Sequence, residues 1–179
     1  SSCTANSNAP EGSASSSDCA CNAGFTGPDG GPCVGCVAGK FKAETGDAAC
    51  IDCGAGKYSP SNWQTSESTC LQCILNSNSP AGSDAASDCQ CNAGFTKPGG
   101  SSQCMGCVAG KYKSVAGPDA CILCEQGKYS TAVGATAVST CLACPRNSNS
   151  QTGSWALTDC TCNAGSSGPD GGACSECEA

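Results

Sequence analysis

The residues with the clearest capacity for chemistry are the 21 cysteines of this 179-residue chain. Seven pairs have the spacing Cys-x-x-Cys, and three have the spacing Cys-x-Cys. Such pairs serve zinc coordination, thiol–disulfide exchange or structural disulfides. Cys33, Cys36, Cys50 and Cys53 even come near the spacing of a zinc ribbon. Because the cysteines form an uninterrupted series that includes Cys-x-Cys pairs, we expect disulfides and no metal site.

Other catalytic chemistry lacks its partners. A redox Cys-x-x-Cys works as one thiol of low pKa within a βαβ frame, and nothing in the sequence supplies that frame. Serine is abundant, but the chain has no histidine to act as a general base. The acidic residues are scattered without an apolar cleft. We therefore expect no enzyme and no cofactor.

The composition also excludes a conventional hydrophobic core. Leu, Ile, Val and Phe together number only 17, which is too few for a packed domain of this length. Cross-links must therefore hold the chain in shape. The net charge of −7 argues against binding to nucleic acid or anionic membrane surfaces. No apolar run is long enough for insertion into a membrane.

The cysteines belong to an internal repeat, because the spacing pattern that begins at Cys3 begins again at Cys73 and at Cys144. The sequence Asn-Ser-Asn recurs at 6–8, 76–78 and 147–149, and Cys-Asn-Ala-Gly recurs at 21–24, 91–94 and 162–165. Three units follow from this period: 3–72, 73–143 and a truncated 144–179. Each full unit has eight cysteines, and the third stops after its fifth, Cys177. We therefore expect a fragment of a longer array in which Cys177 is unpaired.

Long and short intervals alternate between the cysteines. A long interval, such as that between Cys3 and Cys19, is followed each time by a short one of one or two residues. If each long interval closes on itself, ten rings use 20 cysteines and leave one over. A rival phase crosses neighbouring pairs, for example Cys33 with Cys50 and Cys36 with Cys53. Spacing alone does not separate these two arrangements.

Two local motifs resemble known extracellular families. The sequence CACNAGFTG at 19–27, ending at Cys33, resembles the C-terminal half of an EGF-like module. The sequence CVAGKF at 36–41 recurs in related form at Cys53, Cys107 and Cys124, and resembles ephrin-receptor-like and tumour-necrosis-factor-receptor-like cysteine-rich repeats. In both families the corresponding loops close on themselves. The resemblance therefore implies sequential pairs: Cys3–Cys19, Cys21–Cys33, Cys36–Cys50, Cys53–Cys70, Cys73–Cys89, Cys91–Cys104, Cys107–Cys121, Cys124–Cys141, Cys144–Cys160 and Cys162–Cys174.

These motifs predict a small disulfide-rich fold: an elongated rod of tandem β-hairpin rings with little helix and no single hydrophobic core. The Gly-Lys-aromatic step should open each hairpin, with the aromatic ring covering the adjacent disulfide. Turns are expected at 28–31, 98–100 and 169–172, which are rich in Pro, Asp and Gly.

Two tryptophans are possible contact residues. Trp63 and Trp155 take positions where other units have Gly134, or Ala14 and Asp84. Each either shields a nearby disulfide or anchors another chain. Six of the eight basic residues lie in the Gly-Lys-aromatic loops, where they form either a positive stripe facing acidic loops or a solvated face. They are Lys40, Lys42, Lys57, Lys111, Lys113 and Lys128.

The sequence therefore predicts an extracellular structural repeat protein at a cell surface, as a stalk or filament subunit of a fibril or appendage. Its expected partner is itself. The alternative, which the family resemblance implies, is a cell-surface receptor ectodomain that binds a protein ligand. The close likeness of the units and their Ser-, Gly- and Ala-rich loops favour the filament. Ser13, Ser15, Ser16 and Ser17, and the Ser/Thr residues near Pro10, Pro60 and Pro80, are candidate sites for O-glycans.

Overall fold

The computed structural model describes residues 2–99 and 101–178. Within them it has 20 strands of two residues each, five 3-10 helices of three residues, and no α-helix. The chain forms two compact units, whose bounds differ from those of the three sequence repeats. From here on, unit 1 is Ser1–Cys89 and unit 2 is Gln90–Ala179. No helix in the described ranges has the length and hydropathy needed to cross a bilayer. Little helix was expected, and this is confirmed.

Unit 1 consists of short strands separated by loops and three 3-10 helices. The strands are β1 (Ser7–Asn8), β2 (Ala20–Cys21), β3 (Phe25–Thr26), β4 (Val34–Gly35), β5 (Lys40–Phe41), β6 (Ile51–Asp52), β7 (Lys57–Tyr58), β8 (Leu71–Gln72) and β9 (Ser77–Asn78). The 3-10 helices are η1 (Ser16–Asp18), η2 (Glu67–Thr69) and η3 (Ala86–Asp88). Antiparallel pairs form between β1 and β2, β3 and β4, β5 and β6, and β7 and β8.

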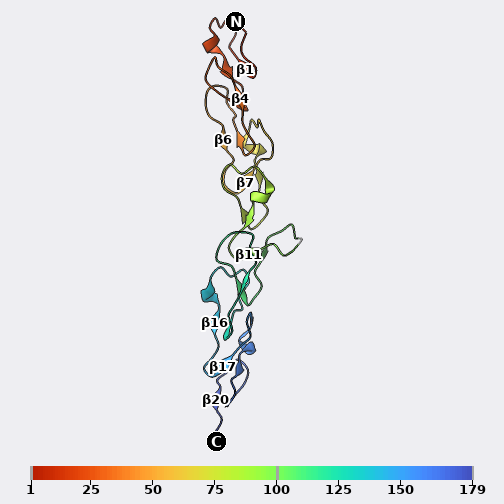
Figure 1. The fold of residues 1–179 in the computed structure, drawn as a ribbon, viewed down its shortest axis with the longest axis vertical. Helices are drawn as coiled ribbons and strands as arrows, with labels where there is room; N and C mark the ends of the chain where they lie inside the picture. The colour runs from red at the N-terminus through yellow and green to blue at the C-terminus, as the bar shows by residue number, and fades with distance from the viewer. Residues whose placement is uncertain (1, 100, 179) are drawn as a thin grey trace. The chain divides into compact units, whose positions relative to one another are not determined.

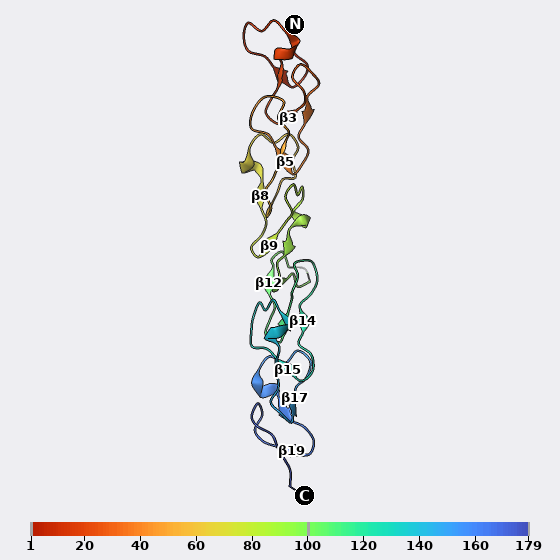
Figure 2. The ribbon, with the colours of Figure 1, turned by 90° about the vertical axis from the view of Figure 1, so that its left-hand side faces the viewer.

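Unit 2 has the same plan. Its strands are β10 (Gln90–Cys91), β11 (Phe95–Thr96), β12 (Met105–Gly106), β13 (Lys111–Tyr112), β14 (Ile122–Leu123), β15 (Lys128–Tyr129), β16 (Leu142–Ala143), β17 (Ser148–Asn149), β18 (Thr161–Cys162), β19 (Ser166–Ser167) and β20 (Ser175–Glu176). Its 3-10 helices are η4 (Val138–Thr140) and η5 (Leu157–Asp159). Consecutive strands from β11 to β20 pair as antiparallel hairpins. Within each unit the hairpins follow one another along one direction, so each unit is elongated (Figures 1 and 2).

Ten disulfides close the long intervals one after another, so that the cysteines pair sequentially along the chain. We number these rings 1 to 10 in chain order. Their Cα–Cα distances lie between 5.5 and 5.7 Å, which is the usual disulfide range. A hairpin of two residues per strand is not stable by itself, so ring closure provides the constraint that the strands lack. Cys177 is exposed and free.

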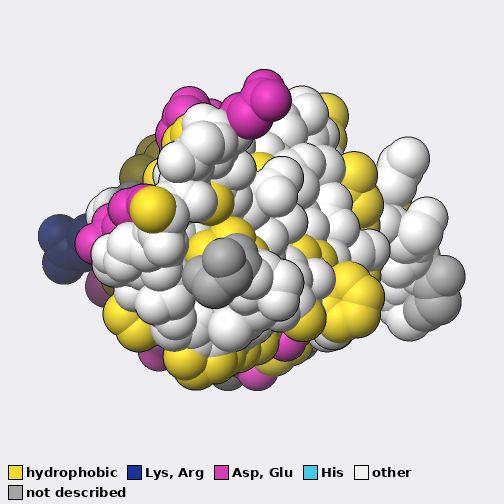
Figure 3. Space-filling model, turned by 90° about the horizontal axis from the view of Figure 1, so that it is seen from above, with side chains coloured by type: hydrophobic (Ala, Val, Ile, Leu, Met, Phe, Trp, Pro, Cys, Tyr) yellow, Lys and Arg dark blue, Asp and Glu magenta, His cyan; other side chains and the backbone are white. Residues whose placement is uncertain are grey.

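The buried apolar residues are almost all half-cystines. Apart from Phe41 and Ala135, every buried hydrophobic residue in the described ranges is a cysteine. Phe41 lies in one buried cluster with Cys53 and Cys70, as expected for an aromatic ring that covers the adjacent disulfide. Many larger apolar side chains remain outside, and Figure 3 shows hydrophobic atoms on the surface among polar ones. The predicted absence of a single hydrophobic core is confirmed.

The turns follow the predicted chemistry. The amide of Gly31 donates to the carbonyl of Pro28 at 2.9 Å, and Gly172 donates to Pro169 at the same distance. Gly30 and Gly171 take φ values of 77° and 73° inside these turns, a backbone conformation that favours glycine. The third predicted turn, 98–100, includes Gly100, which lies outside the described residues.

The Asn-Ser-Asn motif has a backbone role that the repeat pattern alone does not reveal. Asn6, Asn76 and Asn147 have φ values of 62°, 61° and 58°. They take the place that glycine has before the hairpins of other rings, such as Gly39 with φ of 81°. Asparagine is the residue other than glycine that best tolerates this left-handed region, so the motif marks the same turn.

Candidate functional site: joints between rings and an aromatic platform

A pair of backbone hydrogen bonds connects rings 2 to 5 in succession in unit 1, and rings 6 to 9 in unit 2. At the joint of rings 2 and 3, the amide of Gly24 donates to the carbonyl of Lys42 at 2.9 Å, and the amide of Gly46 donates back to the carbonyl of Cys21 at 2.8 Å. Both donors have positive φ, at 81° and 119°. The turn geometry of glycine therefore aims one amide from each ring at the other.

The same joint recurs along both units. In unit 1, rings 3 and 4 are joined by Gly39 to Ser59 and Trp63 to Cys36, and rings 4 and 5 by Gly56 to Ser79 and Gly82 to Cys53. In unit 2 the three joints are Gly94 to Lys113 with Gly117 to Cys91, Gly110 to Ser130 with Gly134 to Cys107, and Gly127 to Ser150 with Gly153 to Cys124. All these bonds are 2.7 to 2.9 Å long. Because backbone groups make them, the joint is independent of most side chains.

A buried lysine reinforces the first joint of each set. Lys42 is only 2% exposed, and its Nζ donates to the carbonyl of Phe25 at 2.7 Å and to that of Gly46. Lys113 is equally buried, and its Nζ donates to the carbonyls of Phe95 at 2.8 Å and Gly117 at 2.6 Å. Each ammonium group thus connects two rings through main-chain oxygens, where hydrogen bonds to a charged donor are strong.

Burial has an electrostatic consequence at Lys113. Removal from water disfavours the charged ammonium and lowers the pKa of Lys113, while the carboxylate of Asp119 acts in the opposite direction. The two carbonyl oxygens accept hydrogen bonds from two of the three N–H donors of this ammonium group and so offset part of the cost of removing it from water.

The lysines therefore form neither a positive stripe nor a uniformly solvated face. Lys42 and Lys113 are buried. Lys40 pairs with Asp52 across its hairpin at 2.6 Å, and Lys128 pairs with Glu125 at 3.0 Å. Both sequence interpretations treated all six as surface cations, since burial of a lysine depends on contacts that the repeat pattern does not show.

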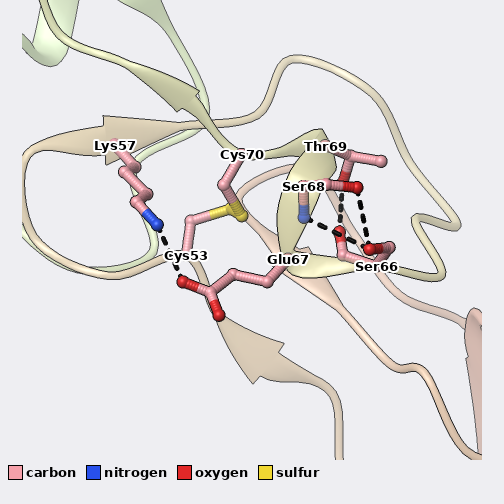
Figure 4. Close-up of polar contacts among 7 residues, drawn as sticks. All are labelled: Cys53, Lys57, Ser66, Glu67, Ser68, Thr69 and Cys70. Atoms are coloured by element: carbon pink, nitrogen blue, oxygen red, sulfur yellow. Dashed lines mark hydrogen bonds and ion pairs between the residues drawn. A yellow bond between two sulfur atoms is a disulfide. The ribbon is translucent and has the colours of Figure 1, made fainter.

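Lys57 pairs with Glu67 at 2.7 Å, beside the disulfide between Cys53 and Cys70 (Figure 4). The helix η2 positions Glu67, and Ser66 caps that helix by accepting a hydrogen bond from the Ser68 amide at 3.2 Å. The hydrogen bond and charge of Lys57 lower the pKa of Glu67. Glu67 is exposed and Lys57 is half-buried, so the pair lies at the surface of ring 4.

Trp63 adopts an unusual backbone conformation. Its φ is 61°, which is strained for a bulky residue. Its ring stacks on Phe25 with a centroid distance of 6.2 Å and an interplanar angle of 18°. A Cβ built on Gly35 would lie 2.0 Å from its Cδ1, so the absent side chain of Gly35 makes room for the indole. Even so, 61% of Trp63 remains exposed.

Trp155 lies in ring 9 without an aromatic partner among the described residues. It is 64% exposed. Its amide donates to Oδ2 of Asp159 at 2.8 Å, which fixes the backbone before η5. The two tryptophans belong to different units.

The other sequence candidates lie on the surface or in disulfides. Cys33, Cys36, Cys50 and Cys53, which come near zinc-ribbon spacing, take part in three separate disulfides. Serines 15–17 are exposed around η1, where Ser15 caps the helix.

Comparison with known families supports the sequence resemblance. Residues 94–141 match a family described as tyrosine-protein kinase ephrin type A/B receptor-like. No curated protein matches the chain. The matched segment contains two complete rings, Cys107–Cys121 and Cys124–Cys141, and the Gly-Lys-Tyr step of each. Disulfides in this number are typical of extracellular proteins. The chain is therefore a disulfide-linked repeat protein of the extracellular type, with an ephrin-receptor-like cysteine-rich segment at 94–141.

Proposed function

We propose that this chain is a structural subunit of an extracellular stalk or filament, such as a surface fibril or appendage. The observation that carries the proposal is the recurrence of one backbone joint three times in each unit. A repeated element that links each ring to the next in the same way suits a protein whose purpose is to extend and to hold its length.

The covalent rings limit how far the chain can be stretched. Only one or two residues lie between consecutive rings. At about 3.5 Å per residue step and one disulfide span per ring, the oxidised chain between Cys3 and Cys174 reaches roughly 140 Å under tension. Without disulfides the same residues reach roughly 600 Å. The disulfides therefore keep most of the chain out of the path of an applied force.

The surface suits association between like chains. Because the joints use backbone groups, the exterior is free to carry apolar residues, and Val34, Ile51 and Leu71 are 65%, 57% and 47% exposed in unit 1. In unit 2 the corresponding Met105, Ile122 and Leu142 are 55%, 52% and 53% exposed. Repeated apolar positions favour head-to-tail contacts, which continue as open filaments when the rotation does not close.

A receptor ectodomain is the second candidate, because residues 94–141 match a receptor-like family. In that role the rings would present a site for a protein ligand. The closely similar joints of the two units favour the filament, since a ligand site needs one ring whose side chains differ in kind from the others.

Electron microscopy of the purified, oxidised chain tests the choice, together with sedimentation velocity across a concentration range. Ordered filaments, or mass that rises with concentration, support the structural role. A chain that remains monomeric and is captured by one cell-surface protein supports the receptor. Peptide mass spectrometry of native material tests O-glycosylation: hexose or pentose increments on peptides containing the exposed serines 15–17 support it, and bare peptides oppose it.

A further inference from the structure

The surroundings of Trp63 show which residues accommodate an indole side chain in this fold. In unit 1, β3 and β4 place Phe25 directly opposite Gly35. We call such a Phe–Gly cross-strand pair a platform. The Trp63 ring stacks on the phenyl group at 6.2 Å and lies where a side chain on Gly35 would be. An aromatic ring that covers a cross-strand glycine is a known stabilising arrangement in sheets.

Unit 2 has the same platform without a tryptophan on it. β11 and β12 place Phe95 opposite Gly106. The residue in the place of Trp63 is Gly134, whose amide makes the same 2.7 Å bond to the carbonyl of Cys107 that Trp63 makes to Cys36. The nearest atoms to a Cβ on Gly106 are at 3.6 and 3.7 Å, from Val133 and Gly134. A Cβ on Gly106 would therefore meet only ordinary van der Waals contacts, and among the described residues no aromatic ring stacks on this platform.

The chain has a second indole, and it is free. Trp155 is 64% exposed, and its indole does not reach the Phe95–Gly106 platform of its own chain. Gly153, two residues earlier, is bonded to Cys124 at the joint of rings 8 and 9, whereas the platform adjoins the joint at Cys107. Oδ2 of Asp159 also holds the amide of Trp155 at 2.8 Å.

We propose that Trp155 of one chain places its indole on the Phe95–Gly106 platform of a second copy. The inference rests on the proposed self-association and supplies its contact. Tryptophan is the residue type most enriched at interface hot spots. Because donor and platform are different surfaces, each chain offers one of each, and the contact extends as an open filament when the rotation between copies does not close.

The charges beside the two surfaces agree with this pairing. Lys97 and Lys111 line a groove of about 360 Å³ that includes Gly106. Within the described ranges neither lysine has an ion-pair partner, unlike Lys40, Lys57 and Lys128. Trp155 lies beside the carboxylate of Asp159. An acidic neighbour on the donor and cations beside the platform favour encounter in this orientation.

Sedimentation velocity on the full, oxidised chain tests the contact with two variants. Trp155→Ala removes the indole. Gly106→Ala places a methyl group where the indole must lie, and it preserves the fold because its Cβ has room and Gly106 does not have positive φ. Each variant should weaken self-association by roughly 30-fold, as for loss of a hot spot. Gly54→Ala, at an open position in unit 1, is the matched control and should associate like the wild type.

Mixing the two variants provides the decisive measurement. Trp155→Ala retains its platform and Gly106→Ala retains its indole, so an equimolar mixture should form discrete dimers at concentrations where each alone is monomeric. If both variants associate as strongly as the wild type, this contact is overturned but the filament proposal stays in place. A mixture without dimers, when both variants are weakened, also overturns the pairing. A wild type that stays monomeric throughout overturns both proposals.

Discussion

Replacing Lys113 by methionine should loosen the joint between rings 6 and 7. Methionine retains the apolar stem but loses the ammonium group, which donates to the carbonyls of Phe95 at 2.8 Å and Gly117 at 2.6 Å. A hydrogen bond to a charged donor contributes about 1.5–3 kcal/mol. Relief of the buried charge offsets part of this loss, since burial lowers the pKa of Lys113. We expect a net loss of about 2 kcal/mol in the free energy of opening the joint, which is roughly 30-fold in its opening equilibrium.

Native-state hydrogen exchange at neutral pH measures this opening directly. The amide of Gly94 donates to the Lys113 carbonyl at 2.8 Å, and that of Gly117 donates to Cys91 at 2.9 Å. Both should exchange roughly 30-fold faster in the oxidised Lys113→Met chain. Unit 1 is a control within the same molecule, because Gly24 and Gly46 form the equivalent joint and should be unaffected.

Two further variants sharpen the test. Lys42→Met should transfer the effect to Gly24 and Gly46 in unit 1. Lys111→Met changes a neighbouring lysine that is not buried, and should leave Gly94 protected. Unchanged protection of Gly94 in Lys113→Met chains would refute the idea that the ammonium group holds the joint. Equal loss in both units would mean that the effect is not local.

The pH dependence of this joint has a definite sign. The folded chain holds Lys113 with a pKa below its ordinary value of 10.5. Between the lowered value and 10.5 the unfolded state binds more protons, so stability rises with pH across that window and is lost as pH falls through it. The protection of Gly94 in the wild type, relative to Lys113→Met, should therefore increase towards pH 10.5.

Three other outcomes are expected. Gly35→Ala should destabilise the chain by about 1–3 kcal/mol and reduce the near-UV circular dichroism of the stacked Trp63, because its Cβ would lie 2.0 Å from the indole. Gly106→Ala should change stability by less than about 0.5 kcal/mol. Equal effects of the two substitutions would contradict the claim that the Trp63 indole occupies the space beside Gly35. Glu67 should titrate below 4.5 by NMR, since its hydrogen bond with Lys57 lowers its pKa; the contribution of the pair is present above 4.5 and lost as pH falls through the lowered value, and Lys57→Met should bring the titration back up. Under force, reduction should lengthen the stretched chain by roughly 450 Å; an oxidised chain that already extends as far would show that the rings do not bear the load.

The succession of hairpin rings could be predicted from the sequence because each ring is specified locally. A Gly-Lys-aromatic step, a long interval rich in turn residues and the cysteine that ends it all lie within one ring, as between Cys36 and Cys50. The scarcity of large apolar residues likewise excluded a core from composition alone. The sequential pairing was a matter of family resemblance, because spacing is compatible with crossed pairs as well.

The tertiary structure decided what lies between rings. Lys42 looks like Lys40 in the sequence, yet one is buried against the carbonyl of Phe25 and the other pairs with Asp52 at the surface. Trp63 takes a glycine-like φ because Phe25, far earlier in the chain, offers a ring to stack on. Such contacts join residues from different rings, and their energies depend on how one ring faces the next. The repeat therefore specifies each ring, and only the packing of ring against ring determines which lysines are buried and where an indole packs.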